Sequence, residues 1–257
     1  MFFGRPATGI GPTKQKALQV GRFLQTCDAT AYDLRRYGHG RGANKSEGFH
    51  KNGYLCKVKK GFAIEVPGGS GKILLHACCA PCSGAIVECL VNNGYRPVIF
   101  YSNSNIVPFS EYSHRLNECL RYAAEFGLEV VEDAYDHAGW RGCTVGLEGE
   151  PERGARCLEC FKQRLLRAAQ YASANGFDVL TTTLASSRWK SLDQVNEAGR
   201  WACSQVEGVT WWPQNWRKGG LQERRGEIIK EQNFYNQLYC GCEFSQRTGS
   251  GEPSEAL

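Results

Sequence analysis

Cysteines at short spacings are the residues of this chain that are best suited to chemistry. The chain has 13 cysteines in 257 residues, and three of them lie in the heptapeptide His76–Cys82 (HACCAPC), directly after the apolar run Ile73–Leu75. That run predicts a short buried strand, and the residues from Ser83 onward show a helical pattern. We therefore expect these thiols at a helix N-terminus, where the helix dipole favours the thiolate form that binds metals.

A second pair of cysteines, Cys157 and Cys160, lies at the start of a later segment with helical periodicity. Their spacing lets both sulfurs face the same side of the first helical turn. Because parallel strands end at one edge of a sheet, these sulfurs can meet those of Cys78 and Cys79. Four thiolates suit a [4Fe–4S] cluster or an all-cysteine zinc site, although the adjacency of Cys78 and Cys79 argues mildly against structural zinc. Cys82 could bind a second metal, face a substrate or stay free.

Two further cysteines, Cys240 and Cys242, are separated by a single glycine. A disulfide between them would close a small, strained ring and would be easily reduced. This favours a catalytic redox couple, and the alternatives are two more metal ligands or idle thiols. Three other cysteines fall within helical patterns and are expected to pack in the core: Cys89, Cys119 and Cys203.

Polar residues follow two other predicted strands, in the stretches Tyr101–Asn105 (YSNSN) and Thr181–Lys190 (TTTLASSRWK). Amides, hydroxyls and cations at strand ends suit a polar ligand that carries phosphate, whereas ordinary capping would explain either stretch alone. Tryptophans stand beside cations in Trp211–Gly220, which suits either stacked bases or a buried core. We expect His76 to be a satisfied core histidine rather than a ligand or a proton donor.

Alternating apolar and helical segments position these residues. Strands are predicted at Lys72–Ala77, Pro97–Tyr101, Leu128–Glu132, Asp178–Thr182 and Val209–Trp212. Helices are predicted at Ser83–Asn93, Ser110–Phe126, Leu158–Asn175, Ser191–Val206 and Leu221–Gln232. This order indicates an α/β fold with a five-stranded parallel sheet and helices on both faces. The Gly- and acid-rich segment Asp133–Arg156 is predicted to be a long functional loop.

Composition divides the chain into three parts. Residues 1–70 contain 12 Lys and Arg against 4 Asp and Glu, a net charge of +8, whereas the rest of the chain has a net charge of −3. Residues 1–71 are therefore predicted to be a loosely ordered basic extension and linker, 72–246 a catalytic domain, and 247–257 a disordered tail. No apolar run long enough to span a membrane and no signal-peptide pattern is present, so we expect a cytoplasmic location. Many cysteines in a cytoplasmic chain favour metal or redox chemistry.

An ordered set of motifs over residues 72–246 resembles the QueH family of epoxyqueuosine reductases. Each motif alone is weak, but their order and spacing together are specific. The set comprises His76–Cys82, Tyr101–Ile106, Glu111–Arg115, Tyr135-Asp136, Trp140, Arg156–Arg164, Thr181–Leu184, Arg217–Gly219 and Tyr239–Ser245.

The resemblance implies a fold like that of the adenine-nucleotide α-hydrolases and an activity on tRNA. The family reduces the epoxide of epoxyqueuosine at the anticodon wobble position and releases water, which completes queuosine synthesis. An electron donor that the sequence does not identify would supply the reducing equivalents.

The resemblance also implies roles for individual residues. Four cysteines would hold a [4Fe–4S] cluster: Cys78, Cys79, Cys157 and Cys160. Cys240 and Cys242 would form a redox-active disulfide. Members of the family can carry an additional iron, for which Cys82 is the candidate ligand. The substrate nucleotide would be positioned by Asn103, Asn105, Arg188 and Lys190.

Three other functions compete with this interpretation. A non-enzymatic zinc module that binds RNA would also use clustered thiols. An ATP-dependent tRNA-thiolating or adenylating enzyme would need a phosphate-binding loop after the first strand, where three cysteines and Pro81 stand instead. A thiol–disulfide oxidoreductase would leave the four predicted cluster ligands without a purpose.

Overall fold

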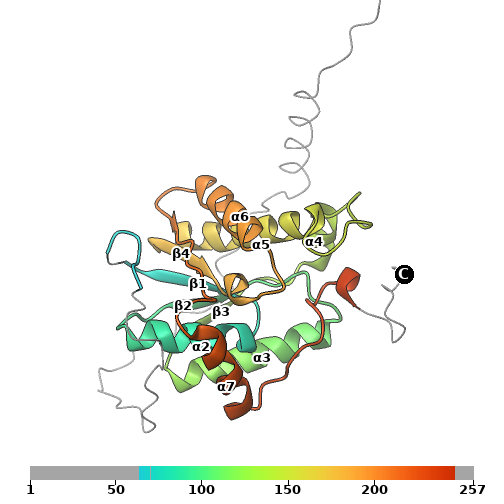
Figure 1. The fold of residues 1–257 in the computed structure, drawn as a ribbon. Helices are drawn as coiled ribbons and strands as arrows, with labels where there is room; N and C mark the ends of the chain where they lie inside the picture. Colours follow the sequence, from blue (N-terminus) through green and yellow to red (C-terminus); the bar gives the residue numbers. More distant parts are fainter. Residues whose placement is uncertain (1–63, 70, 247–257) are drawn as a thin grey trace, which may run out of the picture. The chain divides into compact units, whose positions relative to one another are not determined.

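The central sheet has five parallel strands in the order β3-β2-β1-β4-β5 (Figure 1). In this computed structural model, residues 64–69 and 71–246 are described. The strands are β1 (Ile73–Ala77), β2 (Val98–Tyr101), β3 (Val130–Glu132), β4 (Val179–Thr182) and β5 (Thr210–Trp211). Each lies within a segment that the sequence predicts as a strand, so the predicted five-stranded parallel sheet is confirmed.

Strand β1 lies at the centre of the sheet, between β2 and β4. Leu75 pairs with Ile99 on β2 and with Thr181 on β4. All five residues of β1 are buried, which is why its sequence is apolar without alternation. The chain builds outward from β1 to β2 and β3, and then crosses to β4 and β5. The carboxyl ends of β1 and β4 therefore flank the topological switch point, where open α/β sheets bind their ligands.

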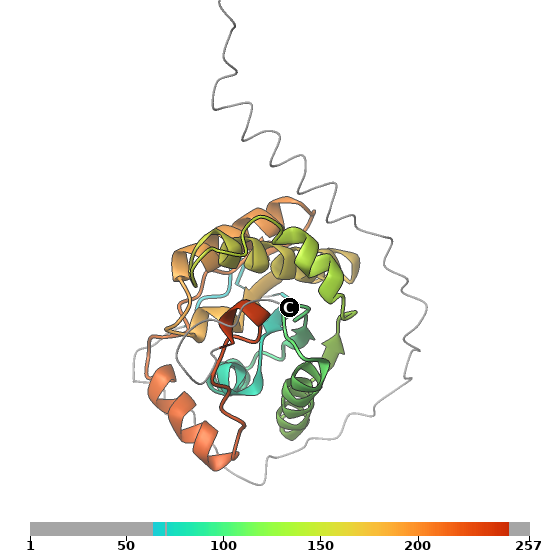
Figure 2. The ribbon, with the colours of Figure 1, turned by 90° about the vertical axis from the view of Figure 1, so that its right-hand side faces the viewer.

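Helices cover both faces of the sheet (Figures 1 and 2). Helices α2, α3 and α7 lie on one face, and α5 and α6 lie on the other, which confirms the predicted doubly wound arrangement. The helices are α2 (Ala80–Asn92), α3 (Phe109–Glu125), α4 (His137–Cys143), α5 (Ala155–Ala174), α6 (Leu192–Ser204) and α7 (Leu221–Glu231). Two short 3₁₀ helices are η2 (Thr183–Ser186) and η3 (Glu243–Ser245).

The predicted loop Asp133–Arg156 contains a helix, α4, that the sequence pattern did not indicate. Two of its seven residues are glycines, which lowers helix propensity and hides the periodicity. The helix is stabilised by tertiary structure instead. The side chain of Asp136 accepts a hydrogen bond from the Gly139 N–H and caps the N-terminus, and Trp140 is buried.

Most of the predicted basic extension and all of the predicted tail lie outside the described residues. Of residues 1–71, the structure describes 64–69 and 71. Val66, which lies in that part, is buried and belongs to the apolar core. In the described part of the chain, no helix is both long enough and apolar enough to cross a membrane.

The segment after α7 runs back to the loop that follows β2. Val107 donates a backbone hydrogen bond to the Gly241 carbonyl over 2.9 Å. The Tyr239 hydroxyl donates to the Val107 carbonyl over 2.7 Å, and Arg115 Nη1 donates to the Cys240 carbonyl over 3.0 Å. These bonds fix residues 239–241, with the cysteine pair, against α3 and the β2 loop.

Candidate metal centre

Three cysteine sulfurs gather where β1 ends and α2 begins. The Sγ atoms of Cys78, Cys79 and Cys82 all lie within 4.8 Å of one another. No other set of three His, Cys, Asp or Glu ligands in residues 64–69 and 71–246 comes this close together. All three cysteines are buried, and Cys79 and Cys78 are separated by 3.8 Å between their sulfurs. Tetrahedral Zn–S bonds of 2.3 Å would separate two ligands by about 3.8 Å, so this triad can bind a metal ion.

Helix α2 begins earlier than predicted, at Ala80 rather than Ser83, with Pro81 in its first turn. Proline is favoured there because its ring presets the helical φ and the missing N–H has no intrahelical partner. Cys79 is the N-cap residue and Cys82 lies in the first turn of the helix. Both cysteines are therefore at the positive end of α2.

Hydrogen bonds among the three thiols distribute their protons unequally. Donation from Cys79 and Cys82 holds the pKa of Cys78 well below its ordinary value. The bond to Cys78 in turn raises the pKa of Cys79 well above its usual range and also raises the pKa of Cys82. The triad therefore favours one thiolate, at Cys78, and a bound metal would displace the remaining protons.

Each sulfur of the triad has a polar neighbour from a different element. Thr183 Oγ1 of η2 donates to Cys78 Sγ over 3.3 Å. Gln237 Nε2 of the C-terminal segment donates to Cys79 Sγ over 2.7 Å. Arg225 Nη2 of α7 lies 3.9 Å from Cys82 Sγ. Such outer contacts orient metal ligands and tune the metal.

Sequence reasoning had assigned no role to any of these three donors. Thr183 lies in a motif of the family resemblance, so its position at a strand end was a usable signal. Gln237 and Arg225 have no such signal, because neither lies in a motif of the resemblance and each reaches its sulfur only in the folded chain.

The second predicted pair lies near the start of α5, with Cys157 in its first turn and Cys160 in its second. Cys157 Sγ accepts the Arg153 backbone N–H over 3.3 Å, and burial raises the pKa of Cys157 to about 11. Burial also raises the pKa of Cys160. Neither sulfur belongs to the group of three, so the structure does not bring all four predicted ligands to single-ion distance.

Two cations, Arg164 and Lys190, lie near the sulfur groups. The positive charge of Arg164 opposes the rise in the pKa of Cys160 and contributes to the low pKa of Cys78. Burial would lower the pKa of Lys190, but attraction to the ionised forms of Cys240, Cys78 and Cys82 outweighs it and the pKa is raised. Arg164 and Lys190 therefore each act on sulfurs from more than one segment.

The predicted redox pair is present as two free thiols. Gly241, between them, has φ +116°, and a Cβ there would lie 2.9 Å from Arg115 Nη1 and from Ile106 Cγ1. Only glycine fits this turn. Cys242 Sγ donates to Ser245 Oγ over 3.4 Å, and burial raises its pKa to about 12. An ionised Cys240 would raise the pKa of both Cys157 and Cys160, so this pair lies near α5.

The predicted substrate residues differ in their surroundings. Asn103 and Asn105 are buried. Asn103 Nδ2 donates to the Ala77 carbonyl over 2.9 Å, and its Oδ1 accepts from Arg164 Nη2, so it braces the end of β1. Asn105 Oδ1 is buried and has no hydrogen-bond partner in the described structure. Arg188 is exposed and Lys190 is partly buried.

Other residues that the sequence analysis considered belong to the core. The ring of His76 is fully buried between Thr182 Oγ1 at 2.8 Å and the Ser102 carbonyl at 3.1 Å, and burial lowers its pKa to about 3. It is therefore a neutral core histidine. Three tryptophans of the stretch 211–220 are buried, so they pack in the core and do not stack on bases. They are Trp211, Trp212 and Trp216. Buried positions also confirm the core role of Cys89, Cys119 and Cys203.

Comparison with known proteins identifies the family. The family model described as "Epoxyqueuosine reductase QueH" matches residues 73–248. A protein of that name from Histophilus somni is 45% identical over 184 residues, which cover 72% of this chain and 76% of the relative. Its namesake from Haemophilus influenzae is 44% identical and covers 72% and 75%. The Thermotoga maritima protein of the same name is 32% identical over 178 residues, covering 68% of this chain and 90% of the relative. The chain belongs to the epoxyqueuosine reductase QueH family of oxidoreductases.

Proposed function

We propose that this chain reduces epoxyqueuosine to queuosine in tRNA in the cytoplasm, and that residues 72–246 form its catalytic domain. The observation that carries the proposal is the triad of buried sulfurs of Cys78, Cys79 and Cys82 at the end of β1, in a chain that matches the QueH family over residues 73–248. Several thiols close together suit electron transfer to a polar substrate that binds at the topological switch point of the sheet.

The donor set fits an iron–sulfur cluster. We propose that Cys78, Cys79, Cys157 and Cys160 hold a [4Fe–4S] cluster, and that Cys82 is a ligand of an additional iron. All five are free thiols, and all but Cys157 are buried. A cluster of four irons is wider than one ion, which suits ligands drawn from two separate helix N-termini. When bound, such a cluster supplies electrons singly.

Removing the epoxide oxygen as water takes two electrons and two protons, and it leaves a carbon–carbon double bond. When Cys240 and Cys242 form a disulfide, they release two electrons and two protons, so one dithiol balances one epoxide. An electron donor then returns the disulfide to the dithiol. Hydrogen bonds from Arg115 to the Tyr239 and Cys240 carbonyls support this step, because they hold the pair's backbone in place.

Cationic residues supply the positive charge that a nucleotide substrate needs. We propose that Arg188 and Lys190 position its phosphate, and that the Asn103 and Asn105 loop contacts the modified base. The unpartnered Oδ1 of Asn105 supports the second part, since a buried acceptor without a donor is costly.

The test is conversion of the modified nucleoside. The full chain is reconstituted anaerobically with iron and sulfide, incubated with tRNA that carries epoxyqueuosine and a reductant, and the nucleosides are analysed by mass. We expect a product lighter by one oxygen atom. Unchanged epoxyqueuosine after incubation with iron-loaded protein would refute the proposal.

A zinc module that binds RNA without catalysis is the second candidate. The 3.8 Å separation of Cys78 and Cys79 favours it, because that distance suits a single ion. Metal analysis of anaerobically purified protein separates the two functions. Zinc without iron would support the module, and iron with acid-labile sulfide would support the reductase.

A further inference from the structure

Two arginine side chains bind all four backbone carbonyls of residues 187–190, the first four residues of the connection between η2 and α6. Arg217 binds the two outer carbonyls. Its Nη2 donates to the Ser187 carbonyl over 2.6 Å and to the Lys190 carbonyl over 2.8 Å. Hydrogen bonds from a charged donor are stronger than neutral ones, so this guanidinium closes the loop into a fixed turn.

Arg153 binds the two inner carbonyls of the same loop. Its Nε donates to the Trp189 carbonyl over 2.9 Å, and its Nη2 donates to the Arg188 carbonyl over 3.1 Å. The backbone N–H of Arg153 also donates to Cys157 Sγ. A single residue therefore connects a sulfur of the candidate metal centre to the loop.

Trp189 is presented to solvent by this fixed backbone. Its side chain is 66% exposed, whereas the other five tryptophans of the chain are buried or partly buried. The Arg188 guanidinium lies 5.1 Å from the centre of the Trp189 ring. An isolated exposed aromatic residue is ordinary on a protein surface. Here, however, four charge-assisted hydrogen bonds fix the loop that carries it.

An exposed aromatic ring beside cations is the arrangement that binds unpaired nucleic-acid bases. The ring stacks on a base of any sequence, and the cations attract the neighbouring phosphates. Three arginines supply this charge: Arg153, Arg188 and Arg217. Ser186, directly before the loop, donates from its Oγ to the Cys82 carbonyl over 3.1 Å, so the loop extends from the thiols to the exposed ring.

We propose that Trp189 is a stacking platform for an unpaired base next to the nucleotide bound at the sulfur site. The inference rests on the proposed function, which supplies an anticodon loop as the ligand. Arg153 and Arg217 are positioning residues, because they hold the loop without contacting the base themselves. The platform selects single-stranded RNA with the target nucleotide already out of its stack.

Binding of an RNA hairpin with an anticodon stem–loop sequence tests the platform, with fluorescence anisotropy as the readout on the reconstituted full chain. Because base stacking on an aromatic ring contributes about 1–3 kcal/mol, we expect Trp189→Ala to weaken binding about tenfold. Trp189→Phe keeps a stacking ring and retains most of the affinity. Leu120→Ala, at a 42% exposed position of α3, is the matched control and leaves binding unchanged.

Hairpins with an abasic nucleotide at single loop positions distinguish stacking from a change in fold. At the stacked position, base removal weakens binding to the unaltered protein and has no further effect on Trp189→Ala. Wild-type affinity of Trp189→Ala would overturn the platform. The platform would also be overturned if removal of a base weakened binding equally for the unaltered protein and for Trp189→Ala at every loop position. Absence of binding of the intact anticodon hairpin to the unaltered protein would count against the proposed function itself, whereas binding that Trp189→Ala leaves unchanged would overturn the platform alone.

Discussion

Gln237 donates a hydrogen bond from its side-chain amide to the sulfur of Cys79, with 2.7 Å between Nε2 and Sγ. The two residues are 158 positions apart in the sequence. Gln237 lies three residues before Cys240, so the segment that carries the candidate dithiol also touches a candidate cluster ligand. The candidate metal centre and the proposed redox pair are therefore connected through this segment.

Removing the Gln237 amide should change the redox potential of a reconstituted cluster. Hydrogen bonds to ligand sulfurs stabilise the more negative, reduced state, so we expect Gln237→Leu to have a lower midpoint potential. Spectroelectrochemical titration measures this directly. Gln246→Leu is the matched control, because Gln246 lies in the same segment and donates to the Val107 carbonyl instead. Equal potentials for Gln237→Leu and the unaltered protein would rule out this role.

Cys157 should be required for the cluster. Loss of one thiolate from a four-thiolate site leaves an iron without its protein ligand, so Cys157→Ala should lose both the visible cluster absorbance and turnover. Cys203→Ala, which alters a core cysteine of α6, should keep both. If Cys157→Ala retains the visible absorbance, Cys157 is not a ligand.

Cys242 should be needed for turnover and not for the cluster. Cys242→Ser removes the redox pair but none of the four proposed ligands, so the absorbance should persist while product formation falls. Nucleoside analysis and the visible spectrum of the same sample provide both readouts. Undiminished product formation would exclude the dithiol as the source of reducing equivalents.

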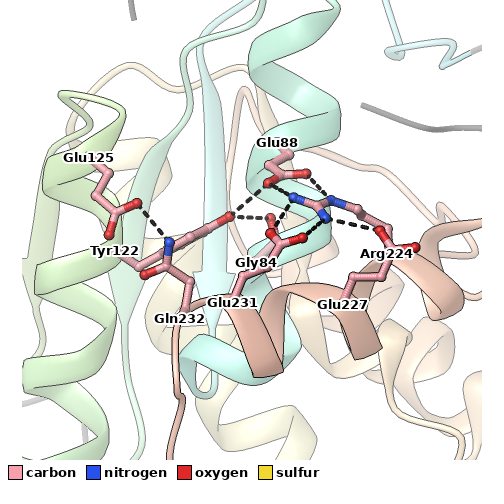
Figure 3. A network of polar contacts seen from close by, with 8 residues as sticks. All are labelled: Gly84, Glu88, Tyr122, Glu125, Arg224, Glu227, Glu231 and Gln232. Atoms are coloured by element: carbon pink, nitrogen blue, oxygen red, sulfur yellow. Dashed lines mark hydrogen bonds and ion pairs between the residues drawn. The ribbon is translucent and has the colours of Figure 1, made fainter. Parts of the chain in front are cut away.

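A buried ion pair between α2 and α7 should dominate the stability of that face (Figure 3). Glu88 accepts two hydrogen bonds of 2.7 Å from Arg224, and both side chains are buried. Glu88→Ala would leave the Arg224 charge partly uncompensated, so we expect a loss of about 3 kcal/mol in the free energy of unfolding. Denaturant titration measures it.

Glu227 provides the control for this pair. It also contacts Arg224, but its side chain is 46% exposed. We expect Glu227→Ala to cost less than about 1 kcal/mol. Similar losses for both variants would contradict the assignment of the stability to burial. The pair matters for the metal centre because Arg225, the next residue of α7, donates to the Pro81 carbonyl over 2.8 Å.

Local sequence patterns are sufficient to predict the sheet and the placement of the thiols near the starts of α2 and α5. The apolar run Ile73–Leu75 and the i, i+3 spacing of Cys157 and Cys160 are signals that lie within a few residues. Helix α4 was missed because its glycines hide the periodicity and a buried Trp140 stabilises it.

Contacts between distant segments could not be predicted from the sequence. The four hydrogen bonds from Arg153 and Arg217 to one loop depend on side chains that meet only in the folded chain. The same limit applies to the tryptophans. A tryptophan beside a cation has the same local sequence whether it is buried, as Trp216 is, or exposed, as Trp189 is.

The most direct test of the account is the iron and acid-labile sulfide content of the anaerobically reconstituted full chain. The proposed ligand set predicts about four irons and about four sulfides per chain, with about one more iron if Cys82 binds it. Zinc alone, or iron without sulfide, would contradict the central claim that cysteines from the β1 turn and from α5 hold one iron–sulfur cluster.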